Sequence, residues 1–304
     1  MNNVHLTGLH ITGRNAPRNG AAMQQQYITH LTLEGLSQNT IRDKRLCLIR
    51  LAAALDPVLL LDATHDMIYA WRASLTTGPQ AVVNYMCAVR CYYDWAIQAG
   101  LHPGPSPADG IPVPRIGQRL PRPITEAALM EVLEAAPRRI RPWLVLAGWA
   151  GLRAQEIARL RCESVLLAAD PPGILVTRET AKGLRERFVP LGDFPAGELA
   201  GRNLGRRGWA WTRRDGLPGP NTPSRVSELC NDHLHDCGFP DTLHSLRHRF
   251  LTQVQRLGKD LRVTQQLAGH RDPAQTALYT LVSGEGSLAV VQALPVPPRL
   301  RAAG

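Results

Sequence analysis

Hydrophobic and polar residues alternate with helical spacing through residues 23–100. Ser37, a residue type favoured at the N-cap, precedes a helical segment that carries Ile41, Leu46, Leu48, Ile49 and Leu51. The pattern therefore predicts a small all-helical domain over residues 23–100. Two more of its helices are expected, one that opens at Asp62 or Thr64 and one over about residues 80–98 that ends at Gly100.

The stretches on either side of this helical region have a different character. Residues 1–22 show no sustained period and contain Asn, Gly and Pro, which predicts a flexible N-terminal arm. Residues 101–123 are rich in proline, which interrupts both helices and sheet ladders and stiffens a connection. We therefore expect a linker over residues 101–123.

A second periodic region follows the linker, and we expect a second domain over residues 124–285. Thr125 is a favourable N-cap for its first helix. The fold class expected for the whole chain is mainly α with a small β-hairpin or sheet (α+β). The expected elements are helices at 125–136 and 140–162, a strand–turn–strand at 174–191, helices near 222–237, 243–257, 260–269 and 273–282, and a C-terminal helix and tail over 286–304.

Composition narrows the class of partner. The formal net charge is +10, from 35 Lys+Arg against 25 Asp+Glu, which favours a polyanion such as nucleic acid. The 6 cysteines are scattered rather than spaced as a disulfide framework, and no segment has the length of a membrane span. These features predict a cytoplasmic protein that does not interact with membranes.

Two segments of the second domain present charged side chains in unusual settings. In the segment GLRAQEIARL, Arg153 falls among apolar positions, and Glu156 lies three residues further on. A structural Arg153–Glu156 pair and an anion-binding arginine are both open interpretations. Lys182 is one of only three lysines in the chain and lies at the expected hairpin tip, beside a glycine. An ammonium can give up a proton, which suits a general acid, although a solvated tip lysine is the simpler interpretation.

The segment TLHSLRHRFLTQV predicts a helix whose apolar stripe packs on the core. His244, Arg247 and His248 lie on the adjacent face, either as a solvated basic surface or as part of a site. The segment LAGHRDPAQTALYTLV then places His270 in a tight turn and Tyr279 on the following helix. Each of these segments taken alone leaves its function open.

Two groups of residues have the types of side chain that bind metals, but neither predicts a metal site. His244 and His248 are four residues apart, yet the glutamate of a zinc-protease motif is missing between them. A second group resembles a zinc cluster, but three of its members continue a buried helical stripe. That second group is Cys230, His233, His235 and Cys237.

Taken in order, the segments resemble the catalytic domain of the tyrosine recombinase (phage integrase) family. The shared features are Gly-Leu-Arg-x-x-Glu, a hairpin-tip lysine, His-x-x-Arg-His, Gly-His, and a tyrosine nine residues after that histidine. The resemblance covers about 130 residues, and residues 23–100 resemble, more weakly, the family's helical core-binding (SAM-like) domain. An arm-binding domain, which many phage integrases carry, would not fit in residues 1–22.

The resemblance implies a role for each matching residue. It makes Tyr279 the nucleophile on a DNA phosphate, with Arg153 and Arg247 as the catalytic arginines. His244 fills the first histidine position and is the expected proton acceptor, while His270 would bond a phosphate oxygen. Lys182 would protonate the leaving 5′-oxygen, and Glu156 would support the site.

The resemblance also implies partners and excludes cofactors. Neither a metal nor ATP is expected, because a phosphotyrosyl bond conserves the energy of the phosphodiester. The expected partners are double-stranded DNA at core attachment sites, three further copies of the chain in a homotetramer, and a directionality factor. The expected reaction exchanges strands through a Holliday junction, and integration of phage DNA into a host chromosome is the favoured role.

Several alternatives stay open. Within the family these are a chromosome-dimer or transposon recombinase, and with the same chemistry a type IB topoisomerase-like enzyme. A DNA-binding regulator without catalysis and a metal-dependent nuclease belong to other classes. A covalent DNA adduct that survives EDTA and needs Tyr279 separates the recombinase from both of them.

Overall fold

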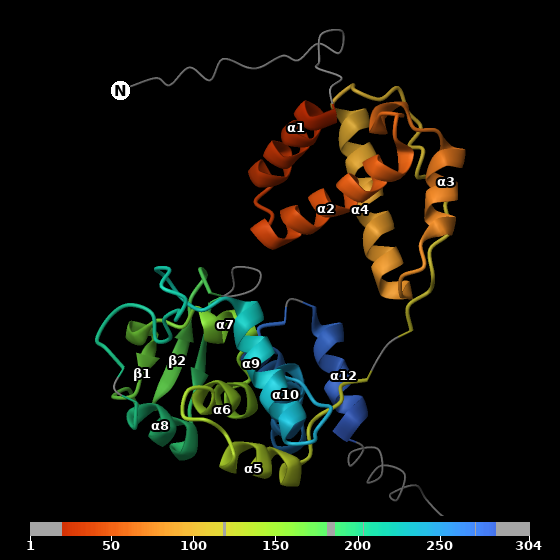
Figure 1. The fold of residues 1–304 in the computed structure, drawn as a ribbon. Helices are drawn as coiled ribbons and strands as arrows, with labels where there is room; N and C mark the ends of the chain where they lie inside the picture. The colour runs from red at the N-terminus through yellow and green to blue at the C-terminus, as the bar shows by residue number, and fades with distance from the viewer. Residues whose placement is uncertain (1–19, 118–119, 181–185, 203, 271, 284–304) are drawn as a thin grey trace, which may run out of the picture. The chain divides into compact units, whose positions relative to one another are not determined.

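The chain folds into two compact units, which divide between residues 118 and 119. A computed structural model describes residues 20–117, 120–180, 186–202, 204–270 and 272–283, drawn as coloured ribbon in Figure 1. Each unit has its own hydrophobic core. Most elements are helices, with one small sheet, so the expected α+β class is confirmed. Within the described residues, no helix is long and apolar enough to cross a membrane.

The first unit is a helical bundle whose helix starts follow the cap residues of the sequence. Ser37 accepts a hydrogen bond from the backbone N–H of Thr40, and Thr64 accepts one from Met67. The second helix packs against both the first and the last helix of the unit. The elements are α1 (Gly20–Leu33), α2 (Gln38–Leu55), η1 (Leu60–Asp62), α3 (His65–Ser74) and α4 (Pro79–Gln98).

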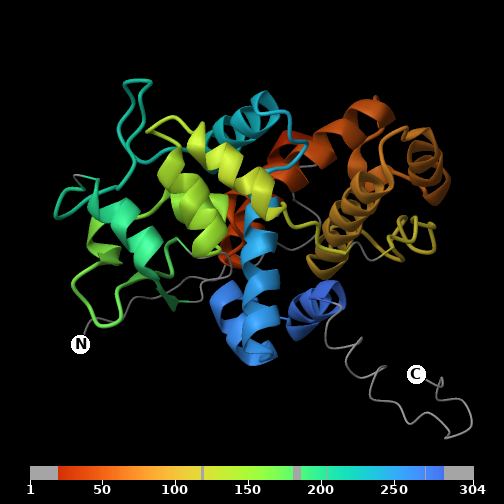
Figure 2. The same cartoon turned by 90° about the horizontal axis from the view of Figure 1, so that it is seen from below.

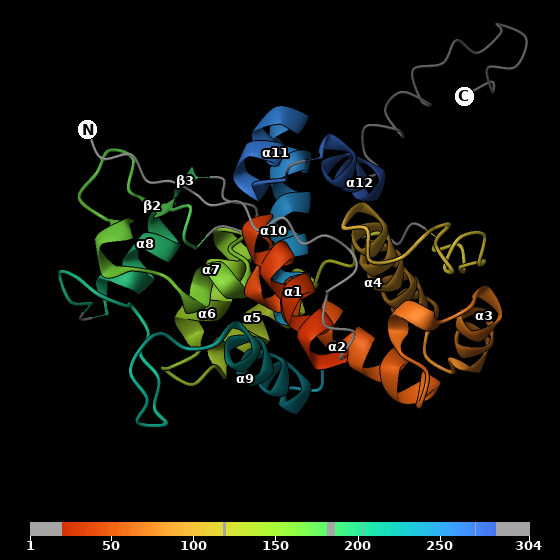
Figure 3. The same ribbon diagram turned by 90° about the horizontal axis from the view of Figure 1, so that it is seen from above.

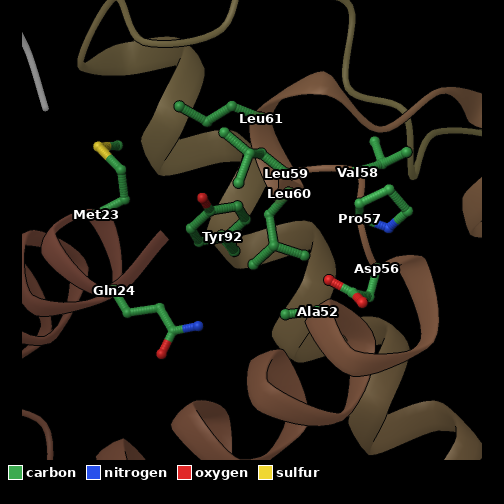
Figure 4. A pocket seen from close by; sticks show the side chains of 10 residues that line it. All are labelled: Met23, Gln24, Ala52, Asp56, Pro57, Val58, Leu59, Leu60, Leu61 and Tyr92. Carbon is green, nitrogen blue, oxygen red and sulfur yellow. The ribbon is translucent and has the colours of Figure 1, made fainter. Parts of the chain in front are cut away.

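The core of this unit contains a cluster of aromatic rings among aliphatic side chains. Tyr27, Tyr92 and Trp95 contact one another with ring centroids between 5.1 and 5.8 Å apart. The buried hydroxyl of Tyr93 donates to the carbonyl of Leu60 at 2.7 Å, which connects α4 to η1. A small pocket opens beside this cluster (Figure 4). It is lined by Met23, Gln24, Ala52, Asp56, Pro57, Val58, Leu59, Leu60, Leu61 and Tyr92.

The segment 101–123, expected as a linker, divides into two parts. Its first half packs on the helical bundle, where Ala108 and Ile111 are 0% and 2% exposed. Arg90 on α4 donates a hydrogen bond of 2.6 Å to the carbonyl of Ile111. The core of the second unit begins with Ile124. Proline prevents regular structure here, but it does not prevent burial.

The second unit carries the remaining helices around one small sheet. Thr125 accepts a hydrogen bond from Ala128 N–H and so caps the first helix, as expected. The elements are α5 (Glu126–Glu134), α6 (Arg141–Trp149), α7 (Ala154–Ala158), η2 (Cys162–Ser164), β1 (Val165–Leu166), β2 (Gly173–Val176), β3 (Arg187–Pro190), α8 (Asp193–Ala200), α9 (Pro223–Asp236), α10 (Leu243–Gly258), α11 (Leu261–Ala268) and α12 (Pro273–Ser283).

The sheet is antiparallel in the order β1–β2–β3. Ile174 pairs with Val189, and both side chains are fully buried in the core of the unit. The expected hairpin of residues 174–191 is therefore present, with β1 as an additional edge strand. The expected hairpin tip, including Lys182, lies outside the described residues.

Helix α10 is central to the unit. It packs against α6 on one side and against α11 and α12 on another, an arrangement that Figures 2 and 3 show from below and above. Leu243 and Leu246 of the expected apolar stripe are buried, whereas Leu257, which the pattern also places in the stripe, is 82% exposed. Leu251, expected on the adjacent face, is fully buried. The polar face of the same helix is thereby held against the helix that carries Tyr279.

The single helix expected over residues 140–162 is interrupted. Helix α6 stops at Trp149, and Gly151 adopts a left-handed conformation with φ of 61°. A Cβ atom at position 151 would lie 2.3 Å from the Phe250 ring, so only glycine fits against α10 here. The chain restarts as α7 with Arg153 at its N-cap. The interruption removes Arg153 from a helix interior and leaves its guanidinium near α11.

Candidate active site

Four parts of the second unit bring the expected site residues together. Arg153 comes from the N-cap of α7, Arg247 and His244 from α10, and His270 from the turn between α11 and α12. His248, for which the sequence predicted no role, lies beside His244 on α10. Tyr279 lies on α12, which packs on both α10 and α11. Hydrogen bonds connect Arg247 to His270 and His248 to Tyr279, and the rings of His270 and Tyr279 stack. The site thus depends on how three helices pack around the break after α6.

Arg153 is oriented by Glu156. Its backbone N–H donates to one carboxylate oxygen of Glu156 at 2.8 Å, and its guanidinium donates to the other at 3.1 Å. A further guanidinium nitrogen lies 3.5 Å from the Gly269 carbonyl. Glu156 is 1% exposed. Burial opposes its ionisation, but hydrogen bonds and charge from Arg187, with the charges of Arg153 and Arg247, outweigh burial and lower its pKa.

Arg247 is the most deeply buried cation of the site, at 1% exposed. Its guanidinium donates to the carbonyl of Gly151 and, at 2.6 Å, to the carbonyl of Ala268. Burial, and next the charge of Arg153, lowers its pKa to about 9, so the group stays protonated at neutral pH. Two neighbouring guanidiniums with one buried carboxylate between them leave an excess of positive charge. Such an arrangement favours an anion.

Arg187 completes this ion network, and the sequence interpretation missed it. Two of its nitrogens donate to the two carboxylate oxygens of Glu156, each at 2.8 Å, and its Nε donates to the Leu267 carbonyl at 2.9 Å. The side chain is 4% exposed. Its donors are directed at the protein, so Arg187 connects β3 and α7 to the end of α11. The signal available in the sequence was the spacing of two between Arg187 and Val189, which places both side chains on the buried face of β3.

His270 is held in a defined orientation. It follows Gly269, which caps α11 with φ of 60°. The His270 Nδ1 lies 2.9 Å from the Thr276 hydroxyl, and Nε2 lies 3.5 Å from an Arg247 nitrogen. Because a guanidinium only donates, Nε2 is assigned as the acceptor and Nδ1–H as the donor. Burial, and next the charge of Arg247, lowers the His270 pKa to about 3, so the ring is neutral at physiological pH.

Tyr279 is buried beside both histidines. Its ring lies nearly parallel to that of His270, with an interplanar angle of 18° and centroids 6.2 Å apart. Its hydroxyl is 2.9 Å from Nδ1 of His248. Burial raises the pKa of the Tyr279 phenol, while Arg247 and Arg153 act in the opposite direction. The charges of both guanidiniums therefore act on the ionisation of this phenol.

His244 and His248 are adjacent on α10 but differ in exposure. Their ring centroids are 4.3 Å apart at 71°, and His244 is exposed while His248 is half-buried. The residue expected as proton acceptor was His244, whereas the histidine in hydrogen-bond contact with Tyr279 is His248. Spacing along one helix identifies the pair as neighbours. It does not show which of them faces α12.

Two other groups of candidate residues have different surroundings. Lys182 cannot be placed relative to the site, because it lies outside the described residues. In the cysteine–histidine group of α9, Cys230 is fully buried, and His233 Nε2 lies 2.9 Å from the Val132 carbonyl. Among the described residues, no group of three or more His, Cys, Asp or Glu side chains is arranged to hold a metal ion.

Comparisons with known proteins agree with this geometry. The profile of the phage integrase family matches residues 124–285. The tyrosine recombinase XerD of Pseudomonas putida is 30% identical over 287 residues, which cover 85% of this chain and 92% of the relative. XerD of Caulobacter vibrioides is 30% identical over 256 residues, covering 77% and 82%.

Solved structures share the fold. A lambda integrase dimer bound to a core site matches with a TM-score of 0.68 at 17% identity, over 85% of this chain and 94% of that one. XerH bound to a palindromic difH substrate, in a post-cleavage complex, matches with a TM-score of 0.66 at 17% identity, over 90% and 84%. The chain belongs to the phage integrase family and is a tyrosine recombinase, an enzyme that cleaves and rejoins DNA through a tyrosine.

Proposed function

We propose that this recombinase acts at specific paired DNA sites, with Tyr279 as the nucleophile. One observation carries the assignment: the Tyr279 hydroxyl is buried beside His248 and His270, next to the cationic pair Arg153 and Arg247. Tyrosine buried for packing alone needs no such surroundings. A phosphate does need them, because its charge increases during nucleophilic attack.

The proposed cleavage step exchanges one phosphoester for another. The Tyr279 hydroxyl gives its proton to a histidine of α10, for which the family resemblance implies His244. The Tyr279 oxygen attacks the scissile phosphorus while the bond from phosphorus to the 5′-oxygen breaks, giving a 3′-phosphotyrosyl link and a 5′-hydroxyl. Arg153 and Arg247 are proposed to stabilise the non-bridging oxygens. Nε2 of His270 faces Arg247, and it must carry the ring proton if it is to donate to a phosphate oxygen, as the family resemblance implies. Lys182 is proposed to give its proton to the leaving 5′-oxygen.

Religation is the reverse of this step and needs no added energy source. The phosphotyrosyl bond conserves the energy of the original phosphodiester, so a 5′-hydroxyl from another strand can attack it. Neither ATP nor a metal ion enters the proposed scheme. Glu156 and Arg187 support the scheme indirectly, because they orient Arg153 from within the protein.

Strand exchange requires more than one active site. We propose that four copies of the chain act on two core sites through a Holliday junction. A lambda integrase tetramer bound to a Holliday junction matches this fold with a TM-score of 0.69 at 15% identity, over 85% of this chain and 76% of that one. The net charge of +10 suits a DNA partner. We also propose that a directionality factor controls the direction of recombination. The proposed site of action is the cytoplasm.

Two biological roles are compatible with this chemistry. Integration of phage DNA is the role that the sequence interpretation favours. Xer-like recombination is the second candidate, and it is favoured by the relatives named XerD that align over most of the chain. The two roles are distinguished with plasmids that carry candidate recombination sites taken from the DNA next to the gene. Joining of two unlike sites supports integration, and resolution of two like sites supports the Xer-like role.

The chemistry is tested with a suicide DNA that carries a nick close to the cleavage site. After cleavage, the short fragment between the cleavage site and the nick diffuses away, so religation is prevented. Wild-type protein should accumulate a covalent adduct in EDTA, and Tyr279→Phe should form none. Tyr27→Phe is the matched control, because the buried Tyr27 hydroxyl has no hydrogen-bond partner among the described residues. Binding without an adduct would instead indicate a regulator, and an adduct abolished by EDTA would indicate metal-dependent cleavage.

A further inference from the structure

His270 is fixed by its backbone on one side and by a buried hydroxyl on the other. Its backbone N–H donates to the Gln265 carbonyl, and its carbonyl accepts from the Gln265 side-chain amide, both at 3.3 Å. These two bonds hold the main chain of His270 against α11. The imidazole is oriented by Thr276 of α12, whose hydroxyl lies 2.9 Å from Nδ1. Thr276 is fully buried, so this hydroxyl has a fixed position.

The His270 ring is neutral, so its one proton can lie on either nitrogen. Burial, and next the charge of Arg247, lowers the His270 pKa to about 3. In a neutral imidazole one nitrogen carries a proton and the other a lone pair, and the hydrogen bonds decide which is which. The charged and titratable groups that face the ring are Arg153, Arg187, Arg247, His248 and Tyr279.

The DNA-free site and the phosphate-bound site require opposite tautomers of His270. Without DNA, Nε2 lies 3.5 Å from an Arg247 nitrogen, which can only donate. The lone pair is then on Nε2, and Nδ1–H donates to Thr276. A phosphate oxygen only accepts, so a hydrogen bond to it requires the proton on Nε2. Nδ1 then carries the lone pair and needs a donor.

We propose that Thr276 is a positioning residue whose hydroxyl holds His270 in both tautomers, by accepting from Nδ1–H without DNA and donating to Nδ1 with DNA. This inference rests on the proposed function, in which His270 bonds a phosphate oxygen. The exchange leaves the ring neutral, because Nε2 takes one proton from water and Nδ1 gives one to water while the hydroxyl hydrogen turns toward the ring. A backbone carbonyl in the place of this hydroxyl would only accept, and it would keep the proton on Nδ1.

The first test measures single-turnover cleavage of the suicide DNA by variants of Thr276. Thr276→Val keeps the shape of the side chain but can neither accept nor donate, and we expect its rate to fall by roughly 10–10²-fold. Thr276→Ser keeps the hydroxyl and should retain most of the wild-type rate. The inference is overturned if the valine variant reacts as fast as wild type, or if the serine variant is as slow as the valine variant.

Thr264→Val is the matched control for the loss of a buried hydroxyl. Thr264 is as fully buried as Thr276, but its hydroxyl donates to Gln255 at 2.9 Å and to the Asp260 carbonyl at 3.0 Å, not to a residue of the site. Thr264→Val should therefore cleave at the wild-type rate. A loss of rate as large as that of Thr276→Val would overturn the inference, because any buried hydroxyl of the unit would then have the same effect.

A double-mutant cycle shows whether Thr276 acts through His270. His270→Ala should slow cleavage by roughly 10²–10³-fold, as expected when one donor to the phosphate is lost. In that background, Thr276→Val should change the rate by less than about 2-fold. If the valine slows cleavage by the same factor with and without His270, Thr276 does not act through the imidazole and the inference fails.

Nitrogen NMR of the wild type measures the tautomers directly and does not depend on how the Thr276 variants fold. The chemical shifts of the ring nitrogens distinguish a protonated nitrogen from one with a lone pair, and the His270 signals are those missing from His270→Ala. We expect Nδ1–H in the DNA-free protein and Nε2–H in the trapped covalent adduct. The same tautomer in both states would overturn the inference alone. Absence of any Tyr279-dependent adduct would instead show that the proposed function is wrong.

Discussion

The two units of the chain bury very different side chains. In the described part of the first unit, the core consists of aliphatic and aromatic groups, and the non-aromatic polar residue among the buried ones is Ser106. The second unit buries Glu156, Arg187 and Arg247, together with a histidine and several hydroxyl-bearing residues. Both units are mostly helical, so the contrast does not come from secondary structure.

The difference shows that the second unit tolerates buried charges, which lower stability, at the place where the catalytic residues lie. Burying an ion is unfavourable unless a partner of opposite charge and hydrogen bonds compensate it. Around Glu156 one carboxylate faces three guanidiniums, which leaves the network short of negative charge. A DNA phosphate would supply that charge. The first unit has no comparable arrangement among its described residues, and its stability should depend mainly on packing.

The largest predicted effect comes from removing Glu156, the single carboxylate that is buried among the described residues. Glu156→Ala leaves Arg187 and Arg247 buried without their counter-ion, and we expect a loss of about 3–5 kcal/mol in the free energy of unfolding. Glu228→Ala, which removes a 56% exposed partner of Arg225, is the control and should cost about 0–1 kcal/mol. Urea denaturation measures both, and equal losses would contradict the contrast between buried and exposed pairs.

The next effect comes from the shape of one cation. Arg187→Lys keeps the charge but cannot donate to both oxygens of Glu156 and to the Leu267 carbonyl together. The free energy of unfolding should fall by about 2–3 kcal/mol. Adduct formation should also slow, because Arg153 is oriented through the same carboxylate. A lysine variant as stable and as fast as wild type would show that the fork geometry is unimportant.

Acid should weaken the second unit before the first. Both His248 and His270 have folded-state pKa values below the ordinary value, at about 4 and about 3. Between about pH 6.5 and pH 4 the unfolded chain binds protons that the folded site does not, so stability falls as pH falls. We expect about 1 kcal/mol for each histidine from pH 7 to pH 5.5. Urea denaturation at the two pH values measures this, and His248→Asn should remove about half of the pH dependence.

The smallest effect is expected in the first unit. Tyr93→Phe removes the hydroxyl that bonds the Leu60 carbonyl at 2.7 Å, which should cost about 1 kcal/mol. Tyr27→Phe, a neighbouring ring whose hydroxyl has no partner among the described residues, should cost nothing or stabilise. Thermal melting compares the two. Cleavage of bound DNA should be unchanged in both variants, since neither ring lies in the second unit.

Local signals in the sequence predicted much of the fold because their causes are local. Ser37, Thr64 and Thr125 cap helices where their side chains reach the next turn, and Gly269 ends α11 where a left-handed residue is required. The helix expected over 140–162 was wrong at Gly151, because apolar spacing continues across the break. At the break, the ring of Phe250, which is distant in sequence, leaves room for glycine alone.

The site was predictable as a set of residues but not as a set of contacts. The motif spacing selected Arg153, Arg247, His270 and Tyr279, which the structure brings together. The partner of Tyr279 depends on the rotation of α10 against α12, which no helical pattern specifies. Arg187 was missed for the same reason, since its partners come from α7 and α11. Lys182 stays a prediction.

Mass spectrometry of the trapped protein–DNA adduct tests the nucleophile most directly. After nuclease trimming and trypsin digestion, cleavage at Arg271 and Arg299 releases a peptide in which Tyr279 is the single tyrosine. The account predicts a nucleotide attached through phosphate to this peptide in the wild type, and at no other tyrosine. A nucleotide found on a different peptide, or DNA cleavage without any attached nucleotide, would contradict it.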